Sequence, residues 1–328
     1  MICHDLTQII KDKTKDARFR KGHIVTREDI PVLLDMGKEH LYVWENRDGM
    51  LHEDDAAQIL YEVLAGTDMA PSEVREGKID VIAKCDGLFD VDKDRLFEIN
   101  SIGEIMAATR HGGFPVKAGD KLAGARVIPL VIAGDKLEEA RAVGAGKPLL
   151  TLTPFQKGKK VGIVTTGSEI LNGRIKDTFM PVLKEKIEEY GAVLTHHELT
   201  GDDGERITKA VTGMMEDGDD MVLCSGGMSV DPDDATPLAI RNTGAEVVSY
   251  GAPVLPGAMF MLAYYNGRPV IGLPGCAMYA KRTIFDLILP RLMANVKITA
   301  EGLADLGHGG LCLNCESCTY PNCGFGKG

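Results

Sequence analysis

Between residues 160 and 292, short runs of β-prone apolar residues alternate regularly with amphipathic helical segments. The alternation is typical of a mostly parallel sheet, because two parallel strands need a long crossover that is usually a helix. Helices then cover both faces of the sheet. We therefore predict a three-layer α/β domain. The expected strands are 161–165, 192–199, 221–224, 245–249, 259–265 and 269–272, and the expected helices are 177–190, 205–215, 235–241 and 276–293.

The residues ahead of this domain have a different pattern. Apolar side chains fall on one face of a helix at 52–64, and a second short helix is expected at 136–143. Between them, 78–83, 96–100 and 126–133 are short β-prone runs separated by glycine-containing turns. This order predicts a smaller α+β domain. The expected division is a polar mobile arm at 1–20, the α+β domain at 21–150, the α/β domain at 151–298 and a Cys-rich tail at 299–328.

The charge balance excludes two broad classes of partner. The chain has 37 Lys and Arg against 48 Asp and Glu, a net charge of −11. Nucleic acids and anionic lipids both require a basic surface. No apolar run approaches the roughly 20 residues that span a bilayer, and the first residues lack the plan of a signal peptide. We expect a cytoplasmic protein that binds neither nucleic acid nor membrane and keeps its eight cysteines reduced.

Three loops of unusual composition follow expected strands. Ligands of open α/β sheets bind at the carboxyl ends of the strands, where these loops would lie. Glycines let backbone N–H groups point at an anion, and Ser and Thr hydroxyls add further donors. The loops therefore predict a phosphate-binding site. Its candidate binding residues are Thr166, Gly167, Ser168, Asp177, Ser225, Gly226, Gly227, Ser229, Thr236, Pro274 and Gly275.

Carboxylates gather in the same loops, at Glu169, Asp202, Asp203, Asp231, Asp233 and Asp234. Clustered carboxylates repel one another, so some should bind a hard cation or accept hydrogen bonds from a ligand ring. The combination favours a ligand with a phosphate, a metal ion and a polar heterocycle. In the alternative interpretation the glycines form ordinary turns, Glu169 is a solvated loop residue, and Asp231 or Asp234 caps the next helix.

The order of these motifs resembles a known family. Thr165–Glu169, Ser225–Ser229, Asp234–Thr236, Pro256-Gly257 and Gly272–Gly275 are similar to the motifs of the molybdopterin-binding domain family. The resemblance covers about residues 158–292 and is greatest to the MoeA-type molybdopterin molybdenumtransferases, whereas residues 21–150 resemble the N-terminal domains of those enzymes only loosely.

The resemblance implies an activity in molybdenum cofactor biosynthesis. Members of the transferase branch exchange the adenylate of adenylated molybdopterin for molybdate, with release of AMP and with help from Mg²⁺. Tungstate is the alternative oxyanion. Carried over by motif, Glu169, Asp203 and Asp234 are the candidate catalytic carboxylates, and Asp202 and Asp231 are weaker candidates for holding magnesium. The resemblance also implies a homodimer.

Departures from the family pattern favour a second, non-catalytic hypothesis. The third loop reads Pro274-Gly275-Cys276-Ala277 where the family has Pro-Gly-Asn-Pro, and Ala258-Met259 stands where a Lys is usual. The 36 residues after 292 are also too few for the C-terminal β-domain of the transferases. The protein could instead be a carrier, chaperone or sensor that delivers finished cofactor to a molybdo- or tungstoenzyme.

A third hypothesis is a magnesium-dependent nucleotide pyrophosphatase acting on ADP-ribose. Competence-protein relatives of the family share the Gly-Gly motif and the pattern Asp233-Asp234-Ala235-Thr236.

The tail contains four cysteines, Cys312, Cys315, Cys318 and Cys323, in the spacing C-x2-C-x2-C-x4-C. Four thiolates within twelve residues can bind one tetrahedral Zn²⁺ or an iron–sulfur cluster. The spacing fits neither ferredoxin pattern strictly, so zinc and cluster both remain open. The alternative is a flexible, thiol-rich tail.

Overall fold

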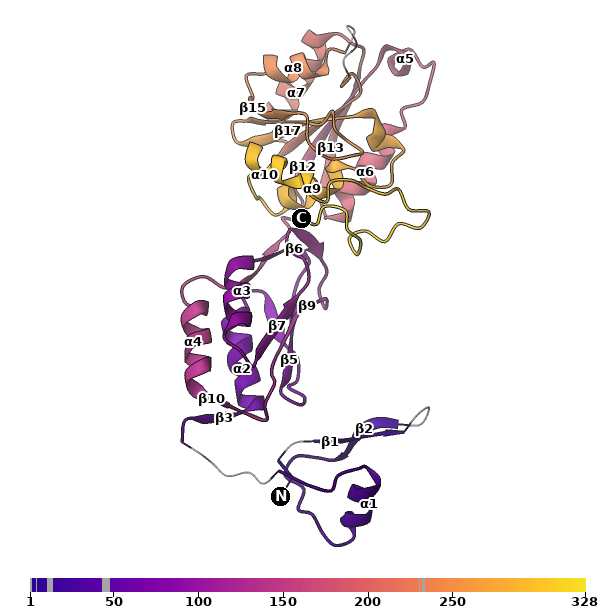
Figure 1. Cartoon of the computed structure of the whole chain (residues 1–328). Coiled ribbons are helices and arrows are strands. Elements are labelled where there is room, and N and C mark those ends of the chain that lie inside the picture. Colours follow the sequence, from indigo (N-terminus) through magenta and orange to yellow (C-terminus); the bar gives the residue numbers. More distant parts are fainter. Residues whose placement is uncertain (1, 4, 11–13, 43–47, 230, 232–233) are drawn as a thin grey trace. The chain divides into compact units, whose positions relative to one another are not determined.

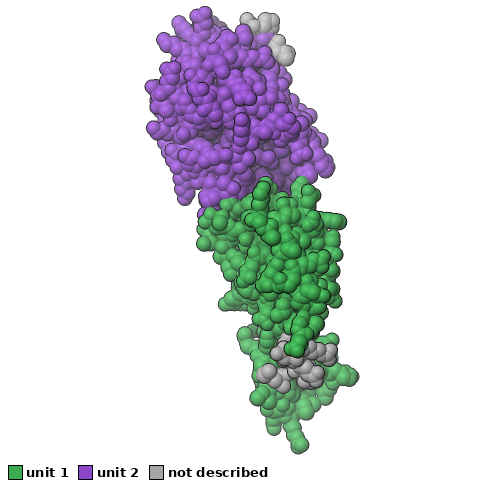
Figure 2. Space-filling model, turned by 90° about the vertical axis from the view of Figure 1, so that its left-hand side faces the viewer, with its two compact units in different colours: residues 1–84, 90–110, 118–152 green, residues 85–89, 111–117, 153–328 purple. Residues whose placement is uncertain are grey.

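The protein is described by a computed structural model that places residues 2–3, 5–10, 14–42, 48–229, 231 and 234–328. The chain divides into two compact units, which Figure 2 colours separately. Residues 1–84, 90–110 and 118–152 form unit 1, and residues 85–89, 111–117 and 153–328 form unit 2. Among the described residues, no helix is long and apolar enough to cross a membrane.

Unit 2 is built on a mixed sheet with strand order β13-β12-β14-β17-β16-β15 in the described residues (Figure 1). The first four strands in this order are parallel, and β16 is antiparallel to both of its neighbours. The strands are β12 (Lys160–Thr166), β13 (Val193–Thr200), β14 (Met221–Ser225), β15 (Glu246–Tyr250), β16 (Met261–Tyr265) and β17 (Arg268–Leu273). The strand predictions for this part of the chain are confirmed within two residues.

Helices cover both faces of this sheet, as the three-layer prediction requires. On one face Ile163 of β12 belongs to the same buried apolar cluster as Leu183 and Ile288. On the other face Val164 clusters with Val211 and Ile240. The alternation follows from the strand geometry, since successive side chains point to opposite faces. The elements are α5 (Ser168–Leu171), α6 (Phe179–Glu189), α7 (Gly204–Glu216), α8 (Thr236–Asn242), η1 (Gly275–Met278), α9 (Ile284–Met293), α10 (Ala300–Ala304) and η2 (Asp305–Gly307).

The last predicted helix is wrong in its first half. Residues 276–293 were expected to form one helix, but only α9 is α-helical, and it begins after Thr283. The Thr283 hydroxyl accepts the N–H of Phe285, and the Asp286 carboxylate accepts the N–H of Thr283. This capping box fixes the helix start well after the predicted one.

Unit 1 contains an antiparallel sheet of order β4-β5-β9-β7 and two helices that pack on it, α2 and α3. The α+β prediction is confirmed. The elements that include unit 1 residues are β1 (Leu6–Ile10), β2 (Thr14–Phe19), α1 (Asp29–Asp35), β3 (Met50–His52), α2 (Glu53–Leu64), β4 (Met69–Pro71), β5 (Lys78–Ala83), β6 (Gly87–Val91), α3 (Lys93–Ser101), β7 (Ile105–Thr109), β9 (Lys121–Val127), β10 (Val131–Ala133), α4 (Gly134–Gly144) and β11 (Leu150–Pro154). A further strand, β8 (Phe114–Val116), pairs with β6.

The N-terminal residues differ from the expected mobile arm. Strands β1 and β2 form an antiparallel pair, and Ile2, Leu6, Phe19 and Leu33 are buried together. The high charge of residues 1–20 suggested solvation, but these few apolar side chains are enough to form a small cluster with α1. In the sequence, most of the charged residues of 1–20 fall between these apolar residues.

Two other elements of unit 1 differ from the sequence predictions. Residues 96–100 were expected to be a strand but lie inside α3, whose first turn is capped by the Asp92 carboxylate accepting the N–H of Arg95. The expected strand 126–133 is split into β9 and β10. Pro129 lies between these strands, and a proline cannot donate the hydrogen bond that would continue the ladder.

Candidate functional site

The four parallel strands of unit 2 end at the same level, which brings their following loops to one edge of the sheet. Thr166 at the end of β12 pairs with Thr200 at the end of β13, and Thr165 pairs with Ser225 at the end of β14. Ser225 in turn pairs with Leu273 at the end of β17. The predicted loops are therefore neighbours, as the topology of a parallel sheet requires.

The Gly226-Gly227 turn after β14 is held against two threonines. Thr236 Oγ1 donates to the carbonyl of Gly226 at 2.9 Å, and Thr166 Oγ1 lies 3.3 Å from Thr236 Oγ1. Both glycines have left-handed φ values, +94° and +55°. A Cβ on Gly226 would lie 2.3 Å from the carbonyl oxygen of Thr166, so only glycine fits. This turn positions Thr166, Ser225 and Thr236 together.

The loop after β12 is tied to the loop after β13. The backbone N–H and the hydroxyl of Ser168 both donate to Asp202 Oδ2, at 3.0 and 2.7 Å. Glu169 is exposed, and its carboxylate lies over Gly167, where a Cβ would be 2.9 Å from Glu169 Oε1. Asp202 is therefore occupied by Ser168, whereas Glu169 faces solvent.

Two buried hydroxyls at this edge have no hydrogen-bond partner. Ser225 Oγ and Thr200 Oγ1 are both without one among the described residues. Ser225 is 0% exposed and Thr200 is 3% exposed. A buried polar atom without a partner costs free energy, so such atoms call for an explanation in terms of a ligand or water.

Asp203, a predicted catalytic carboxylate, caps a helix in the structure. It is the N-cap of α7, and its Oδ1 accepts the N–H groups of Glu205 and Arg206 at 3.0 and 3.3 Å. Asp203 had been placed among the candidate catalytic carboxylates. The structure shows a helix-capping side chain, exposed to solvent.

Asp231 and Asp234, in the loop after β14, contact each other. The N–H of Asp231 lies 3.3 Å from Asp234 Oδ2, and the N–H of Asp234 donates to the carbonyl of Asp231 at 3.0 Å. The expectation that Asp231 or Asp234 caps the next helix is wrong, because α8 follows Ala235 and has no side-chain cap. Asp233 and its predicted role lie outside the described residues.

Tyr250, at the end of β15, contacts the loop that follows β14. Its hydroxyl donates to the carbonyl of Met228 at 3.1 Å and lies 3.4 Å from that of Ser229. Burial and the Asp234 carboxylate raise the pKa of Tyr250, so the phenol remains a donor. Tyr250 and Thr200 had not been predicted as site residues. Their only sequence signal is their position at the end of a strand.

Asp177 is fully engaged in a local network. Its Oδ1 accepts the N–H groups of Phe179 and Met180 at the start of α6, at 2.8 and 3.1 Å. Its Oδ2 accepts the Thr165 hydroxyl at 3.0 Å and lies 3.2 Å from His197 Nε2. The carboxylate therefore orients the first turn of α6 and leaves little capacity for a ligand.

The loop after β17 meets the same region. Pro274 is buried, and Gly275 is exposed with open space around its Cα. The Met278 sulfur of η1 contacts the Thr178 hydroxyl beside Asp177. Burial raises the pKa of Cys276, which makes this thiol a weak nucleophile near neutral pH.

The candidate metal ligands can be compared with the contacts that they make in the structure. Among the described residues, no group of three or more His, Cys, Asp or Glu side chains is arranged to hold a metal ion. Asp231 is exposed and Asp202 bonds Ser168. The four tail cysteines are free of disulfides.

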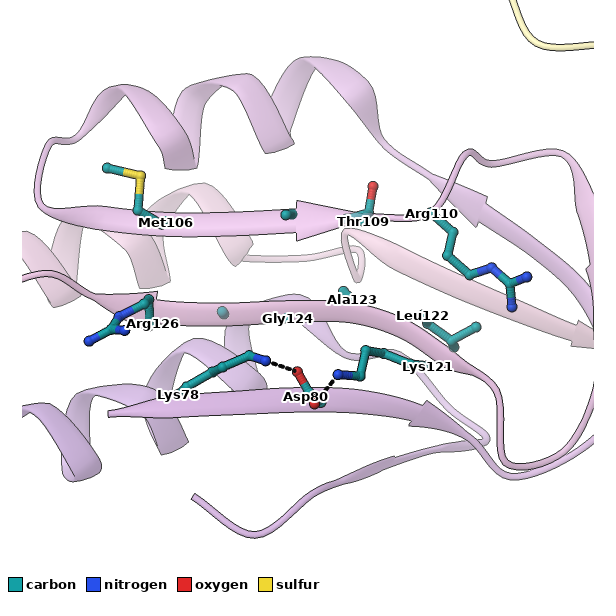
Figure 3. Close-up of a pocket in the computed structure, with 12 residues that line it drawn as sticks. Lys78, Asp80, Met106, Thr109, Arg110, Lys121, Leu122, Ala123, Gly124 and Arg126 are labelled. Carbon is teal, nitrogen blue, oxygen red and sulfur yellow. Dashed lines mark ion pairs between the residues drawn. The ribbon is translucent and has the colours of Figure 1, made fainter. Parts of the chain in front are cut away.

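Unit 1 contains two groups of ion pairs and hydrogen bonds. A hollow of about 440 Å³ lies on β5, β7 and β9, where Asp80 pairs with Lys78 at 3.4 Å and Lys121 at 2.5 Å (Figure 3). Burial opposes ionisation of Asp80, but the two lysines hold its pKa below the usual value.

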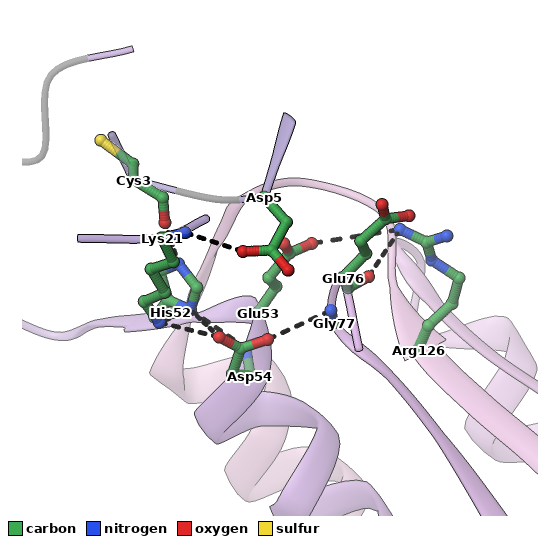
Figure 4. A network of polar contacts seen from close by, with 9 residues as sticks. All are labelled: Cys3, Asp5, Lys21, His52, Glu53, Asp54, Glu76, Gly77 and Arg126. Atoms are coloured by element: carbon green, nitrogen blue, oxygen red, sulfur yellow. Dashed lines mark hydrogen bonds and ion pairs between the residues drawn. The ribbon is translucent and has the colours of Figure 1, made fainter. Parts of the chain in front are cut away.

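The other feature is the network at the start of α2 (Figure 4). His52 Nδ1 accepts the N–H of Asp54 at 3.1 Å, so Nε2 carries the proton that is donated to the Cys3 carbonyl. Lys21 Nζ pairs with Asp54 at 2.7 Å. The network ties the N-terminal residues to α2.

Comparison with known proteins gives a family match for most of unit 2. Residues 162–294 match a family described as "Probable molybdopterin binding domain", and residues 1–45 match a domain of unknown function. A "CinA-like protein" from Mycobacterium tuberculosis (strain ATCC 25177 / H37Ra) is 36% identical over 90 residues, 27% of this chain and 21% of the relative. The chain thus spans about one fifth of the curated relatives it matches.

The solved structures that resemble this chain have lower sequence identity to it than these relatives. The molybdopterin biosynthesis enzyme MoaB from Thermus thermophilus is 22% identical, with a TM-score of 0.36, covering 42% of this chain and 95% of that chain. The molybdopterin biosynthesis MoeA protein from Pyrococcus horikoshii is 17% identical, also with a TM-score of 0.36, covering 78% and 82%.

Proposed function

We propose that the strand-end loops of unit 2, in the part of the chain that matches the molybdopterin-binding domain family, bind adenylated molybdopterin and exchange its adenylate for molybdate or tungstate, with release of AMP. The reaction would place the protein in the last steps of molybdenum cofactor biosynthesis. The ligand's phosphate groups would lie on the loops after β12 and β14.

The observation that carries this proposal is the pair of unpartnered hydroxyls at the strand ends. Ser225 Oγ is buried directly before the left-handed Gly226-Gly227 turn, and Thr200 Oγ1 is buried at the end of β13, opposite Thr166 at the end of β12. A phosphate or pterin group would supply the missing hydrogen-bond partners, and glycine lets such a ligand approach the backbone closely. An acidic protein can bind a phosphate in this way without a lysine.

The carboxylates divide into two groups by their contacts. Asp177, Asp202 and Asp203 are occupied by hydrogen bonds to the protein, so they act as structural or positioning residues in this proposal. Glu169 is exposed, and the Asp234 carboxylate lies 3.3 Å from the N–H of Asp231.

In this proposal, Glu169 and Asp234 would help to hold a magnesium ion that is bound mainly by the substrate phosphates. Mg²⁺ is usually held by one or two carboxylates together with substrate phosphates. When bound it would neutralise charge on the phosphoryl oxygens of the leaving adenylate.

The test is AMP release from adenylated molybdopterin with Mg²⁺, in the presence and absence of molybdate or tungstate. We expect oxyanion-dependent release by the full chain. Ser225→Ala removes an unpartnered hydroxyl, so it should leave the free energy of unfolding unchanged or slightly higher while weakening ligand binding. Thr212→Ala on α7 is the control, because this hydroxyl bonds only its own helix. Unchanged affinity in Ser225→Ala would contradict the placement of the ligand.

A carrier of finished cofactor is the second candidate. Ala258 and Cys276 stand where the family has polar groups, and Asp203 is committed to capping α7. This candidate predicts tight binding of molybdopterin without AMP release. ADP-ribose is included as a further substrate, since its hydrolysis with Mg²⁺ would instead identify a nucleotide pyrophosphatase.

A further inference from the structure

All four tail cysteines line one pocket. Cys312, Cys315, Cys318 and Cys323 border a hollow of about 240 Å³ in unit 2, together with Lys281 and Arg282. Cys315 and Cys318 are exposed, and the other two are partly buried. Sequence spacing alone did not require the four thiols to face a common space. The pocket therefore makes them candidate ligands of one centre.

The loop that carries the cysteines is held from outside. Lys281 Nζ donates to the carbonyls of Cys315 and Glu316, at 3.1 and 2.6 Å. The Tyr320 hydroxyl donates to the carbonyl of Asp286 at 2.9 Å. The protein thus fixes the loop at its middle and its end.

The backbone N–H groups of this loop are free. In the described part of the chain, no N–H from Leu313 to Tyr320 donates a hydrogen bond, and these residues form no helix or strand. Free amides beside cysteines are the donors that hydrogen-bond the sulfurs of iron–sulfur centres and tune their potential. A loop of this kind gains order from the group it binds.

The charge of the pocket suits an anionic centre. Four thiolates are strongly negative, and Lys281 and Arg282 line the same space. The Arg282 guanidinium is fixed by Asp286 at 2.9 Å and packs 4.8 Å from the Tyr320 ring. Two cations in the lining would balance part of the negative charge of a thiolate-ligated centre.

The arrangement favours a cluster over a single ion. Zn²⁺ requires its ligand sulfurs at about 2.3 Å from one point. The four cysteines border a pocket of about 240 Å³, several times the ~30 Å³ that one water molecule takes up, which is large for a single ion. In an iron–sulfur cluster the thiolates are spread over different iron atoms. We propose that Cys312, Cys315, Cys318 and Cys323 bind an iron–sulfur cluster.

The test is anaerobic reconstitution of the full chain with ferric iron, sulfide and a thiol reductant, followed by iron and sulfide analysis and visible absorption. We expect about two or four iron atoms per chain, with an equal amount of sulfide. The number of iron atoms per chain distinguishes the two cluster types that four cysteines bind. Cys315→Ser combined with Cys318→Ser should lose most of the iron. Cys85→Ser, outside the pocket, should retain it.

Three outcomes would overturn the proposal. These are wild-type protein without sulfide-bound iron, unchanged iron in the double variant, and one tightly bound Zn²⁺ per chain that reconstitution does not displace. Cys315 and Cys318 are exposed, so circular dichroism should show a folded double variant. Since no molybdopterin is used, the result is independent of the function proposed for the strand ends.

Discussion

At the scale of single residues, the candidate site depends on backbone conformations that only glycine adopts easily. Gly226 has φ of +94°, and its missing Cβ makes room for the Thr166 carbonyl. Gly218, after α7, has the same φ of +94° but open space around its Cα. The two positions separate the cost of the conformation from the cost of the contact.

Gly218→Ala should lower the free energy of unfolding by about 1–2 kcal/mol, the usual cost of a left-handed alanine. Gly226→Ala should lower it further and should weaken ligand binding, because Cβ would overlap the Thr166 carbonyl. Urea unfolding and ligand titration check both effects. Equal losses in the two variants would show that the contact with Thr166 is unimportant.

Glu53 gives a second prediction at this scale. Burial, followed by the Asp54 carboxylate, raises the pKa of Glu53. The folded protein therefore holds this proton at pH values where the unfolded chain, with a pKa of about 4.3, has lost it. The stability that Glu53 contributes is present below the unfolded pKa and is lost as the pH rises through the folded pKa.

Glu53→Gln should accordingly gain stability relative to the wild type as the pH rises from about 4 to 7. The measurement is the free energy of unfolding as a function of pH. Glu62→Gln, an exposed change on the same helix, is the control. A difference that does not change with pH would contradict the raised pKa.

At the scale of secondary structure, helix caps decide which carboxylates remain available. Asp203 caps α7, and Asp177 accepts two N–H groups at the start of α6. An Asp that follows a strand in sequence can serve a ligand or a helix, and sequence alone does not separate these roles. The N-cap assignment of Asp203 can be tested directly.

Asp203→Ala should lower the free energy of unfolding by about 1 kcal/mol, whereas Asp203→Asn should retain most of the stability, since Asn caps helices as well as Asp does. AMP release should survive in Asp203→Asn. If this variant is stable but inactive, the carboxylate has a chemical role after all.

Much of the architecture could be predicted from the sequence at this scale. The strands of unit 2 are apolar runs bounded by turns, and their order fixes which loops meet. The start of α9 could not be read in this way, because the capping box of Thr283 and Asp286 competes with a continuous apolar pattern. Similarly, residues 96–100 look β-prone, yet the cap of Asp92 sets them in a helix. The unpartnered Ser225 and Thr200 hydroxyls depend on packing and have no sequence signature.

At the scale of the whole molecule, the tail is part of the core of unit 2. Phe325 is 4% exposed and belongs to the main apolar cluster, and Tyr320 lies 6.2 Å from it between ring centroids. The tail was expected to be either a metal-binding segment or a flexible one. It also packs into the domain.

Phe325→Ala should lower the free energy of unfolding by about 3–5 kcal/mol, the usual cost of removing a buried Phe side chain. Tyr279→Ala is the control within the same unit, because Tyr279 is 76% exposed. Thermal or urea unfolding of unit 2 provides the measurement. A small loss in Phe325→Ala would mean that the tail only rests on the surface.

The apolar cluster of unit 2 also contains Phe114, which lies well before the family domain, as Phe325 lies beyond it. Phe114 and Tyr320 pack with ring centroids 6.1 Å apart. During synthesis, the segment 162–294 therefore emerges from the ribosome before its core is complete. Phe114 is made early, but its partners in the tail are still inside the exit tunnel. Folding of this unit is completed after translation of the tail, and a gene fragment that encodes only the family domain would carry an open core.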